Sequence, residues 1–291
     1  MNARVKVVLV CLSSCGLAAG LAAVSIPAGV ATSGAGRTVH LAPVTHPARA
    51  QLESGTAPNI PVPDRGATTI GGFPAALSFN WSGYVASDAT EQYFTGVSGH
   101  WTIPRIVCTS EEDQVVSVWV GIDGSNNETV EQTGTTSECY EQRAIYYSWW
   151  EMFPGPTMVV GTSVAPDDQI SASVTRSGTA YTLQLTDPTS LGNNIDQTEN
   201  CALATCKDTS AEFIVERPDY QAVGLTPLAR FTIPVAFSAA SVTGGSTTGP
   251  ITDFDSFASD MVDATVRYLL AQPGNLNAAG KAFHVTWDDS W

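Results

Sequence analysis

The chain has 291 residues, in which 13 Lys and Arg stand against 28 Asp and Glu. This acidic balance argues against nucleic acid and anionic membranes as partners, because like charges repel. It also suits work in acid, where protonated carboxylates would leave only a small positive charge. An acidic surface that serves solubility alone explains the composition equally well.

The first 31 residues are predicted to be a signal peptide. Arg4 and Lys6 form a basic start, an apolar run continues to Leu12, and small residues follow as far as Ala31, which is the composition of an export signal. Cleavage near Ala28 to Ala31 is favoured over a lipoprotein signal at Cys15. Interruptions by Ser, Cys and Gly argue against a membrane anchor. We therefore expect a secreted, extracellular protein with no membrane contact once the signal is removed.

Residues 32–77 are predicted to be a pro-segment or a disordered linker without a fold of its own. Ala, Pro, Gly, Ser and Thr dominate this stretch, and so few large apolar side chains cannot build a core. Aromatic and β-branched residues become frequent from Phe79 onwards, which places one domain at residues 78–291. Five of the 13 bases and two of the 28 acids precede residue 78, so the domain keeps eight bases and 26 acids, a net charge of −18.

Short strands are predicted throughout the domain, because apolar and polar residues alternate. The runs are 99–103, 115–120, 144–150, 169–174, 181–185, 211–216, 231–233 and 282–287. Clusters of Gly, Asn, Asp and Ser separate them. This pattern predicts an all-β fold, either an antiparallel β-sandwich or a barrel. Residues 255–270 are the exception, since the spacing of Phe257 and Met261 predicts a short amphipathic helix there.

The domain contains an even number of cysteines: Cys108, Cys139, Cys201 and Cys206. In an exported domain this indicates two disulfides. Closeness along the chain favours Cys108 with Cys139 and Cys201 with Cys206, although four cysteines allow three pairings. A zinc site is disfavoured, because the domain has only two His and no C-x-x-C pair. We expect no metal.

The usual catalytic motifs of hydrolases are missing from the sequence. It has no G-x-S-x-G elbow, no H-E-x-x-H, no D-T-G or D-S-G loop and no phosphate-binding Gly-rich loop. A Ser-His-Asp triad would need His100 or His284, and neither lies beside a recognisable nucleophile segment. An enzyme with this sequence must therefore rely on carboxylates and amides.

Two segments supply a carboxylate and an amide in strand-like surroundings. In the Ala-Glu-Phe-Ile-Val-Glu segment, the period of two places Glu212, Ile214 and Glu216 on one face. In the other segment, Gln132 shares a face with Val130 and precedes a Thr-Gly pair that begins a turn. Taken alone, each pattern also fits polar residues on a solvent-facing strand.

The combined series of motifs resembles the glutamic peptidases, or eqolisins. In chain order the motifs are Asn80-Trp81-Ser82-Gly83, Trp119-Val-Gly-Ile-Asp123-Gly, Glu131-Gln132-Thr-Gly, Tyr147-Ser-Trp-Trp-Glu151, Ala211–Glu216 and Phe283-x-Val-Thr-Trp287. The resemblance covers nearly all of residues 78–291. It implies a jelly-roll or concanavalin-like sandwich of two long, curved antiparallel sheets. It further implies endoproteolysis of polypeptides at acid pH, without a cofactor, by a protein that we expect to be a monomer.

By this resemblance, Gln132 and Glu216 match the family's catalytic glutamine and glutamate. The family's supporting and substrate-binding positions fall on Trp81, Trp119, Asp123 and Glu151. Asp123 precedes a Gly, and we expect it either to hydrogen-bond to Gln132 or to order its own turn. The family often has an Asp where this chain has Tyr147, which leaves the arrangement of carboxylates around Glu151 open.

These residue types suit peptide hydrolysis in acid. An ionised Glu216 can take a proton from water and later return it to the leaving nitrogen, while the NH2 group of Gln132 can donate to the developing oxyanion. A carboxyl group with a pKa near ~4.3 stays useful in acid, where a histidine base would be protonated. The sequence therefore predicts a secreted acid endopeptidase with a Gln/Glu dyad.

A carbohydrate-active jelly-roll protein, either a glycoside hydrolase or a lectin-like binder, is the alternative. A glycosidase needs two carboxyl groups about 5 to 9.5 Å apart. Glu212 and Glu216 would lie about 13 Å apart along one strand at ~3.3 Å per residue, which is too far. A lectin would not need a pro-segment. Whether residues 32–77 inhibit the enzyme is left open by the sequence.

Overall fold

The computed structural model describes residues 57–62, 68–70, 72–109, 112–201, 206–220 and 224–290. These residues belong to a compact unit that spans Pro43–Trp291. The predicted signal peptide lies outside the described residues. Within the part of the chain that the structure describes, no helix is both long and apolar enough to cross a membrane.

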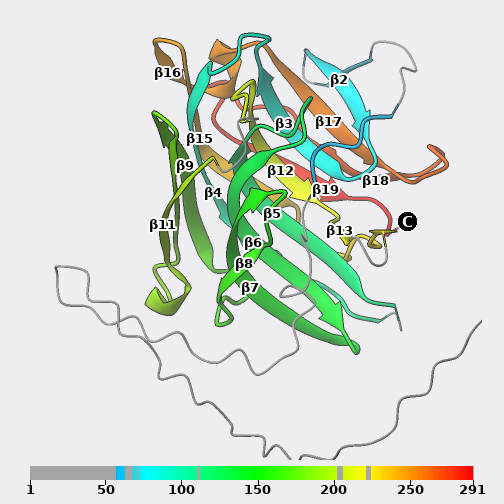
Figure 1. The fold of residues 1–291 in the computed structure, drawn as a ribbon. Helices are drawn as coiled ribbons and strands as arrows, with labels where there is room; N and C mark the ends of the chain where they lie inside the picture. Colours follow the sequence, from blue (N-terminus) through cyan, green and yellow to red (C-terminus); the bar gives the residue numbers. More distant parts are fainter. Residues whose placement is uncertain are drawn as a thin grey trace, which may run out of the picture. The chain divides into compact units, whose positions relative to one another are not determined.

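Strands make up nearly all the regular structure of the described residues, which confirms the all-β prediction (Figure 1). In chain order they are β1 (Thr68–Ile70), β2 (Phe73–Ser78), β3 (Trp81–Ser87), β4 (Phe94–Thr102), β5 (Gln114–Ile122), β6 (Val130–Tyr140), β7 (Arg143–Phe153), β8 (Met158–Gly161), β9 (Gln169–Ser177), β10 (Ala180–Thr186), β11 (Ile195–Asn200), β12 (Ser210–Glu216), β13 (Asp219–Tyr220), β14 (Gly224–Leu225), β15 (Val235–Gly244), β16 (Thr247–Gly249), β17 (Ser256–Val262), β18 (Leu269–Pro273) and β19 (Phe283–Trp287). Two single-turn 3-10 segments accompany them, η2 (Leu191–Asn193) and η3 (Ile251–Asp253).

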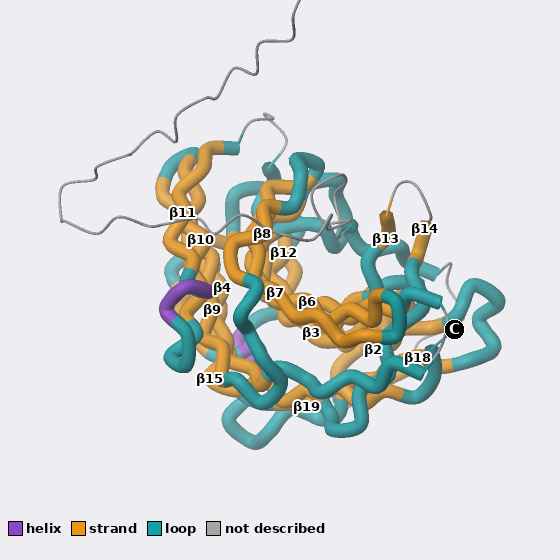
Figure 2. The backbone as a smooth tube through the Cα atoms, turned by 90° about the horizontal axis from the view of Figure 1, so that it is seen from below, coloured by secondary structure: helices purple, strands orange, loops and turns teal. Residues whose placement is uncertain are grey.

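Most strands belong to one 17-stranded hydrogen-bonded sheet. One run of neighbours is β17–β3–β12–β5–β6–β7–β8. The other is β18–β19–β15–β4–β9–β10–β11. All these pairs are antiparallel, and the β17–β18 pair joins the two runs. The sheet therefore curves round until it is nearly closed into a barrel-like shape (Figure 2).

The strand β12 is buried along its whole length. Phe213 and Val215 point from one face into the larger apolar cluster of the protein. Ile214 points from the other face into a smaller cluster, which also contains Trp81, Trp119 and Trp149. The alternation predicted for this strand is thus confirmed. Its acidic side chains, Glu212 and Glu216, lie on the same face as Ile214 and are fully buried. Burial disfavours the charged form of a carboxyl group and therefore raises its pKa.

Both predicted disulfides are present. Cys108 and Cys139 have Cα atoms 5.4 Å apart, and Cys201 and Cys206 have Cα atoms 6.2 Å apart. The first bond ties the segment after β4 to the end of β6, and the second lies between β11 and β12. The first disulfide therefore anchors the end of β6, which carries Gln132, and the second anchors the approach to β12, which carries Glu216.

The predicted helix at residues 255–270 is wrong. This stretch contains β17, a turn and the start of β18. The turn forms because Asp263 accepts backbone N–H groups of Thr265, Arg267 and Tyr268 over 3.0, 2.7 and 2.8 Å. Such a side-chain cap competes with helical hydrogen bonding.

Residues 231–233 do not form a strand either, although Phe231 makes an isolated bridge to Ile106. Pro234 follows directly, and its nitrogen has no hydrogen to donate to a ladder. The other predicted runs coincide with β4, β5, β7, β9, β10, β12 and β19.

The folded region begins earlier than the predicted boundary at residue 78. The strand β2 pairs in parallel with β17, and β1 pairs with β2. Residues 57–62 also contact the sheet, with the N–H of Val62 bonded to the carbonyl of Leu77 over 2.9 Å. The prediction that the stretch before residue 78 has no structure therefore needs correction for these residues.

Candidate active site

Four adjacent strands align the predicted site residues. The register pairs Glu212 on β12 with Gly121 on β5, Gly121 with Gln132 on β6, and Gln132 with Glu151 on β7. Paired residues of neighbouring strands point to the same side of a sheet. Glu216 lies two pleats along from Glu212 and points the same way. Gln132, Glu151 and Glu216 thus share one buried face.

The Trp119 indole lies on this face, in space that two glycines provide. A Cβ on Gly121 would lie 2.9 Å from Trp119 Cζ3, and one on Gly134 would lie 2.5 Å from Trp119 Cβ. The ring of Trp81 packs edge-on against it, with 5.0 Å between ring centroids. The indole is therefore held in one position.

The carboxylate of Glu216 is fully buried and accepts hydrogen bonds from several donors. Trp119 Nε1 donates to Oε2 over 2.7 Å, and Oε1 accepts from the N–H of Ala57 over 3.0 Å and from Asn80 Nδ2 over 3.3 Å. Burial raises the pKa of Glu216 well above its ordinary value, because the charged form loses its hydration. The nearby charge of Glu151 raises this pKa further, whereas the three hydrogen bonds lower it.

Gln132 is held in place by Glu151. Gln132 Nε2 donates to Glu151 Oε2 over 2.9 Å, and the hydroxyl of Thr157 donates to Glu151 Oε1 over 2.9 Å. Both Gln132 and Glu151 are fully buried. An amide NH2 group can donate two hydrogen bonds, of which Glu151 accepts one. The arrangement fixes the direction of an amide donor in surroundings of low polarity, where such a donor acts most strongly.

Asp123 lies away from Gln132 and orders a turn. Its Oδ2 accepts the N–H groups of Lys207 and Asp208 over 2.7 and 2.8 Å, and its Oδ1 accepts the N–H of Thr209 over 2.9 Å. Asn127 Nδ2 also donates to Oδ1, over 2.7 Å. Only the bond from Asn127 lies within the turn that follows Asp123, as one of the two predicted roles requires. The other three bonds tie the end of β5 to the segment that leads into β12.

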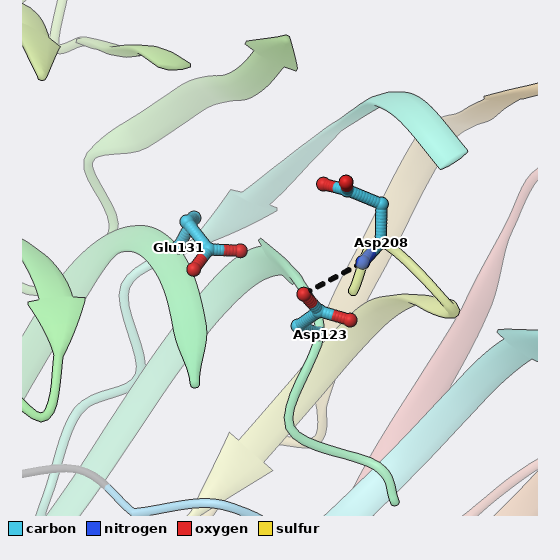
Figure 3. Close-up of side chains that lie close together, drawn as sticks. All are labelled: Asp123, Glu131 and Asp208. Carbon is cyan, nitrogen blue, oxygen red and sulfur yellow. Dashed lines mark hydrogen bonds between the residues drawn. The ribbon is translucent and has the colours of Figure 1, made fainter. Parts of the chain in front are cut away.

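A second carboxyl cluster lies beside this turn (Figure 3). Carboxylate oxygens of Asp123, Glu131 and Asp208 lie within 4.8 Å of one another, and all three residues are buried. Arg176 Nε lies 3.2 Å from Asp208 Oδ2, and Tyr181 donates to Asp208 Oδ1. This spacing could hold a cation, but these donors and those around Asp123 already balance part of the charge. Burial, followed by the neighbouring acids, raises the pKa of Glu131 well above normal.

Sequence reasoning missed the contacts of Asn80, Thr157 and Ala57. Asn80 precedes β3, which pairs with β12 so that Trp81 lies opposite Glu216. The Asn-Trp pair at the start of the predicted domain was therefore the available signal for Asn80. Ala57 offers no such signal, because it lies 159 residues from Glu216 along the chain.

Residues 79–267 match the model of the Peptidase A4 family. Aspergillopepsin-2 from Aspergillus niger is 27% identical over 261 residues, which cover 77% of this chain and 90% of that protein. Among solved structures, scytalido-glutamic peptidase with a transition state analog inhibitor superposes with a TM-score of 0.60 at 22% identity, over 72% of this chain and 98% of that one. SCP-B, a member of the eqolisin family in a complex with the tripeptide Ala-Ile-His, gives 0.56 at 22% identity with the same coverage.

At these identities the two structures establish a shared fold. The family match establishes membership of the family, because it covers well over half of the chain and includes β3 through β17 and every predicted site residue. The protein belongs to the Peptidase A4 family, the eqolisins, and is a glutamic-type endopeptidase.

Proposed function

We propose that the protein is a secreted endopeptidase that hydrolyses peptide bonds at acid pH with Glu216 as general base and Gln132 as oxyanion donor. The observation that carries the proposal is their common position. Both side chains are fully buried on one face of the sheet, and Trp119 lies between their strand positions with its indole bonded to Glu216. Buried polar groups held this firmly are typical of functional sites.

In the proposed reaction, the ionised Glu216 removes a proton from a water molecule as the water oxygen bonds to the peptide carbonyl carbon. The carbonyl oxygen becomes an oxyanion, which the NH2 group of Gln132 stabilises. Protonated Glu216 then gives its proton to the peptide nitrogen, and the carbon–nitrogen bond breaks. The products are a carboxylic acid and an amine, and Glu216 returns to its starting state.

The supporting residues act through this dyad. Trp119 holds one oxygen of Glu216, Glu151 directs the amide of Gln132, and Trp81 packs against Trp119. Asp123 acts at a distance by holding the segment that leads into β12. A donor of the oxyanion-hole kind contributes about 100- to 1000-fold in rate.

A glutamate base is active at a pH above its own pKa, and its ordinary value of ~4.3 allows activity in acid. Burial raises the pKa of Glu216 and works against this, whereas the hydrogen bonds to its carboxylate lower the pKa. The proposed acid range therefore rests on the donors that oppose the effect of burial. The acidic surface favours the same range, since protonation of carboxylates there relieves repulsion.

We further propose that the two runs of neighbouring strands are the two curved antiparallel sheets of a sandwich. The domain, predicted at residues 78–291 and extended in the structure by β1 and β2, is proposed to be a monomer that is released after export. A domain with two disulfides suits an oxidising extracellular setting.

The proposal is tested by incubating the purified protein with a denatured protein substrate between about pH 2 and pH 7. We expect internal peptide bonds to be cut in the acid half of this range, with products identified by mass spectrometry. Pepstatin and a chelator should leave the rate unchanged. Cleavage that is abolished by the chelator, or that occurs only near neutral pH, would contradict the proposed chemistry.

A further inference from the structure

Arg217 directly follows the proposed catalytic base in the chain and is only 5% exposed. Its backbone N–H donates to the carbonyl of Asn80 over 3.1 Å, and its Nε donates to the carbonyl of Phe79 over 2.5 Å. One residue therefore binds two consecutive carbonyl groups in the connection between β2 and β3. None of the steps of the proposed reaction involves this buried cation.

The connection that Arg217 binds carries a donor to Glu216. Asn80 Nδ2 donates to Glu216 Oε1 over 3.3 Å. At the other end of the same amide, Oδ1 accepts from the hydroxyl of Ser78 over 3.0 Å, and the Ser78 oxygen accepts the N–H of Asn80 over 3.2 Å. Ser78 thus determines which end of the amide faces Glu216, while Arg217 holds the main chain from which that amide extends.

The bonds from Arg217 persist throughout the acid range. Burial lowers the pKa of Arg217 to about 10, whereas the charges of Asp263 and Asp219 raise it. A guanidinium with this pKa stays protonated in acid and keeps its N–H donors there. The carbonyl groups of Phe79 and Asn80 do not titrate either, so the connection is held in the same way at every pH at which the proposed base acts.

We propose that Arg217 is a positioning residue, which holds Asn80 in the direction from which it donates to Glu216. The inference deepens the proposed function and rests on the role of Glu216 as general base. Burial raises the pKa of Glu216, and the bond from Asn80 is one of those that lower it. A misdirected Asn80 would therefore leave less Glu216 ionised on the acid limb of the pH profile.

Two neutral substitutions of similar length separate the side-chain bond of Arg217 from its charge. In Arg217→Gln, the amide nitrogen stands at the position of Nε and can donate to the carbonyl of Phe79, whereas Arg217→Met places a methyl group there. The measurement is kcat/KM for cleavage of denatured protein across the acid range. We expect Arg217→Met to lower it about 10-fold on the acid limb, as for the loss of one hydrogen bond to a charged group, and less on the plateau. Arg217→Gln should stay within about 2-fold of the unchanged protein.

Asn80→Ala shows whether Arg217 acts through Asn80. Residues of one hydrogen-bond network have non-additive effects, so Arg217→Met should cause no further fall in a protein that already carries Asn80→Ala. Thermal unfolding establishes that each variant is folded. If Arg217→Met does not fold, Arg217→Lys takes its place, because lysine keeps the cation and has a carbon atom where arginine has Nε.

An equal fall with and without Asn80 would overturn the inference, because Arg217 would then act by another route. Equal pH profiles for Arg217→Gln and Arg217→Met would overturn it too, because the bond to Phe79 would then have no effect of its own. In both cases the unchanged protein still cleaves in acid, and the proposed function stands. If the unchanged protein cleaves denatured protein at no pH, the proposed function fails and the inference fails with it.

Discussion

The Trp119 indole donates a 2.7 Å hydrogen bond to Glu216 Oε2, in a position fixed by Gly121 and Gly134. This bond favours the ionised form of Glu216 and so lowers its pKa against the larger effect of burial. We predict that Trp119→Phe lowers kcat/KM by about 10-fold or more, because hydrogen bonds to charged groups contribute ~1.5–3 kcal/mol. The acid limb of the pH profile should move to higher pH, since the pKa of Glu216 rises without the donor.

Trp101→Phe is the matched control for this substitution. Trp101 is equally buried, and its Nε1 donates to Thr135 Oγ1 over 3.0 Å, within the larger apolar cluster. A similar loss of stability with no shift of the pH profile is expected. The account of Trp119 is contradicted if the two variants have the same profile.

Glu151→Gln is predicted to move the acid limb in the opposite direction. The charge of Glu151 raises the pKa of Glu216, so its neutralisation lowers that pKa and extends activity to lower pH. The glutamine oxygen can still accept from Gln132, and the plateau rate should fall by no more than ~10-fold. The pH dependence of kcat/KM is the measurement, and Glu128→Gln, at an exposed position, is the control. A shift to higher pH would refute the electrostatic role.

Gly134→Ala is predicted to destabilise the protein and to reduce activity together. Its Cβ would lie 2.5 Å from Trp119 Cβ, a clash that must move the indole or the strand. Overpacking of this kind costs about 1–3 kcal/mol in the free energy of unfolding. Gly192→Ala is the control, because a Cβ there would meet nothing within 4 Å. Urea unfolding of the two variants compares the costs, and equal values would show that the space around Trp119 is not tightly filled.

The stability of the protein is predicted to fall as the pH rises from about 4 to 7. Burial raises the pKa values of Glu131, Asp208 and Glu212, so the folded state holds their protons more tightly than the unfolded chain does. This contribution to stability is complete below the unfolded pKa values of ~4 and is lost as the pH rises through the raised folded values. The pKa of Asp187 is lowered in the folded state, so its contribution to stability is present above the unfolded pKa and is lost as the pH falls below ~4. It therefore does not oppose the trend between pH 4 and pH 7.

Glu131→Gln tests this dependence, because it removes one of the raised groups and keeps the side-chain size. We expect the midpoint of thermal unfolding to change less between pH 4 and pH 7 than in the unchanged protein. Asp196→Asn, at an exposed position, should leave the dependence as it was. An unchanged slope in Glu131→Gln would mean that this cluster does not govern stability in acid.

Much of the strand pattern could be predicted, because the period of two is a local property. Phe213 and Val215 enter one cluster and Ile214 the other, as the alternation indicates. The helix predicted around Phe257 and Met261 was wrong for a related reason. Residues four apart lie on one face of a helix and also on one face of a strand, so that spacing alone does not separate the two.

The contacts that complete the site could not be predicted in the same way. The bond between Asn80 and Glu216 depends on the register of β3 against β12, and the bond from Ala57 joins residues 159 positions apart. Register and long-range docking are set by the packing of the whole domain, which a local pattern does not encode. The contacts of Asp123 could not be predicted either, because its partners before β12 begin with Lys207, which lies 84 residues later in the sequence.

The central claim is that Glu216 is the base and Gln132 the oxyanion donor, and Glu216→Gln tests it most directly. Glutamine keeps the size of the side chain and an acceptor for Trp119, so the fold should persist, as judged by thermal unfolding at acid pH. We predict that this folded variant, measured with residues up to 62 both present and removed, loses cleavage of denatured protein by at least about 1000-fold. A folded Glu216→Gln variant that retains the activity of the unchanged protein would contradict the account.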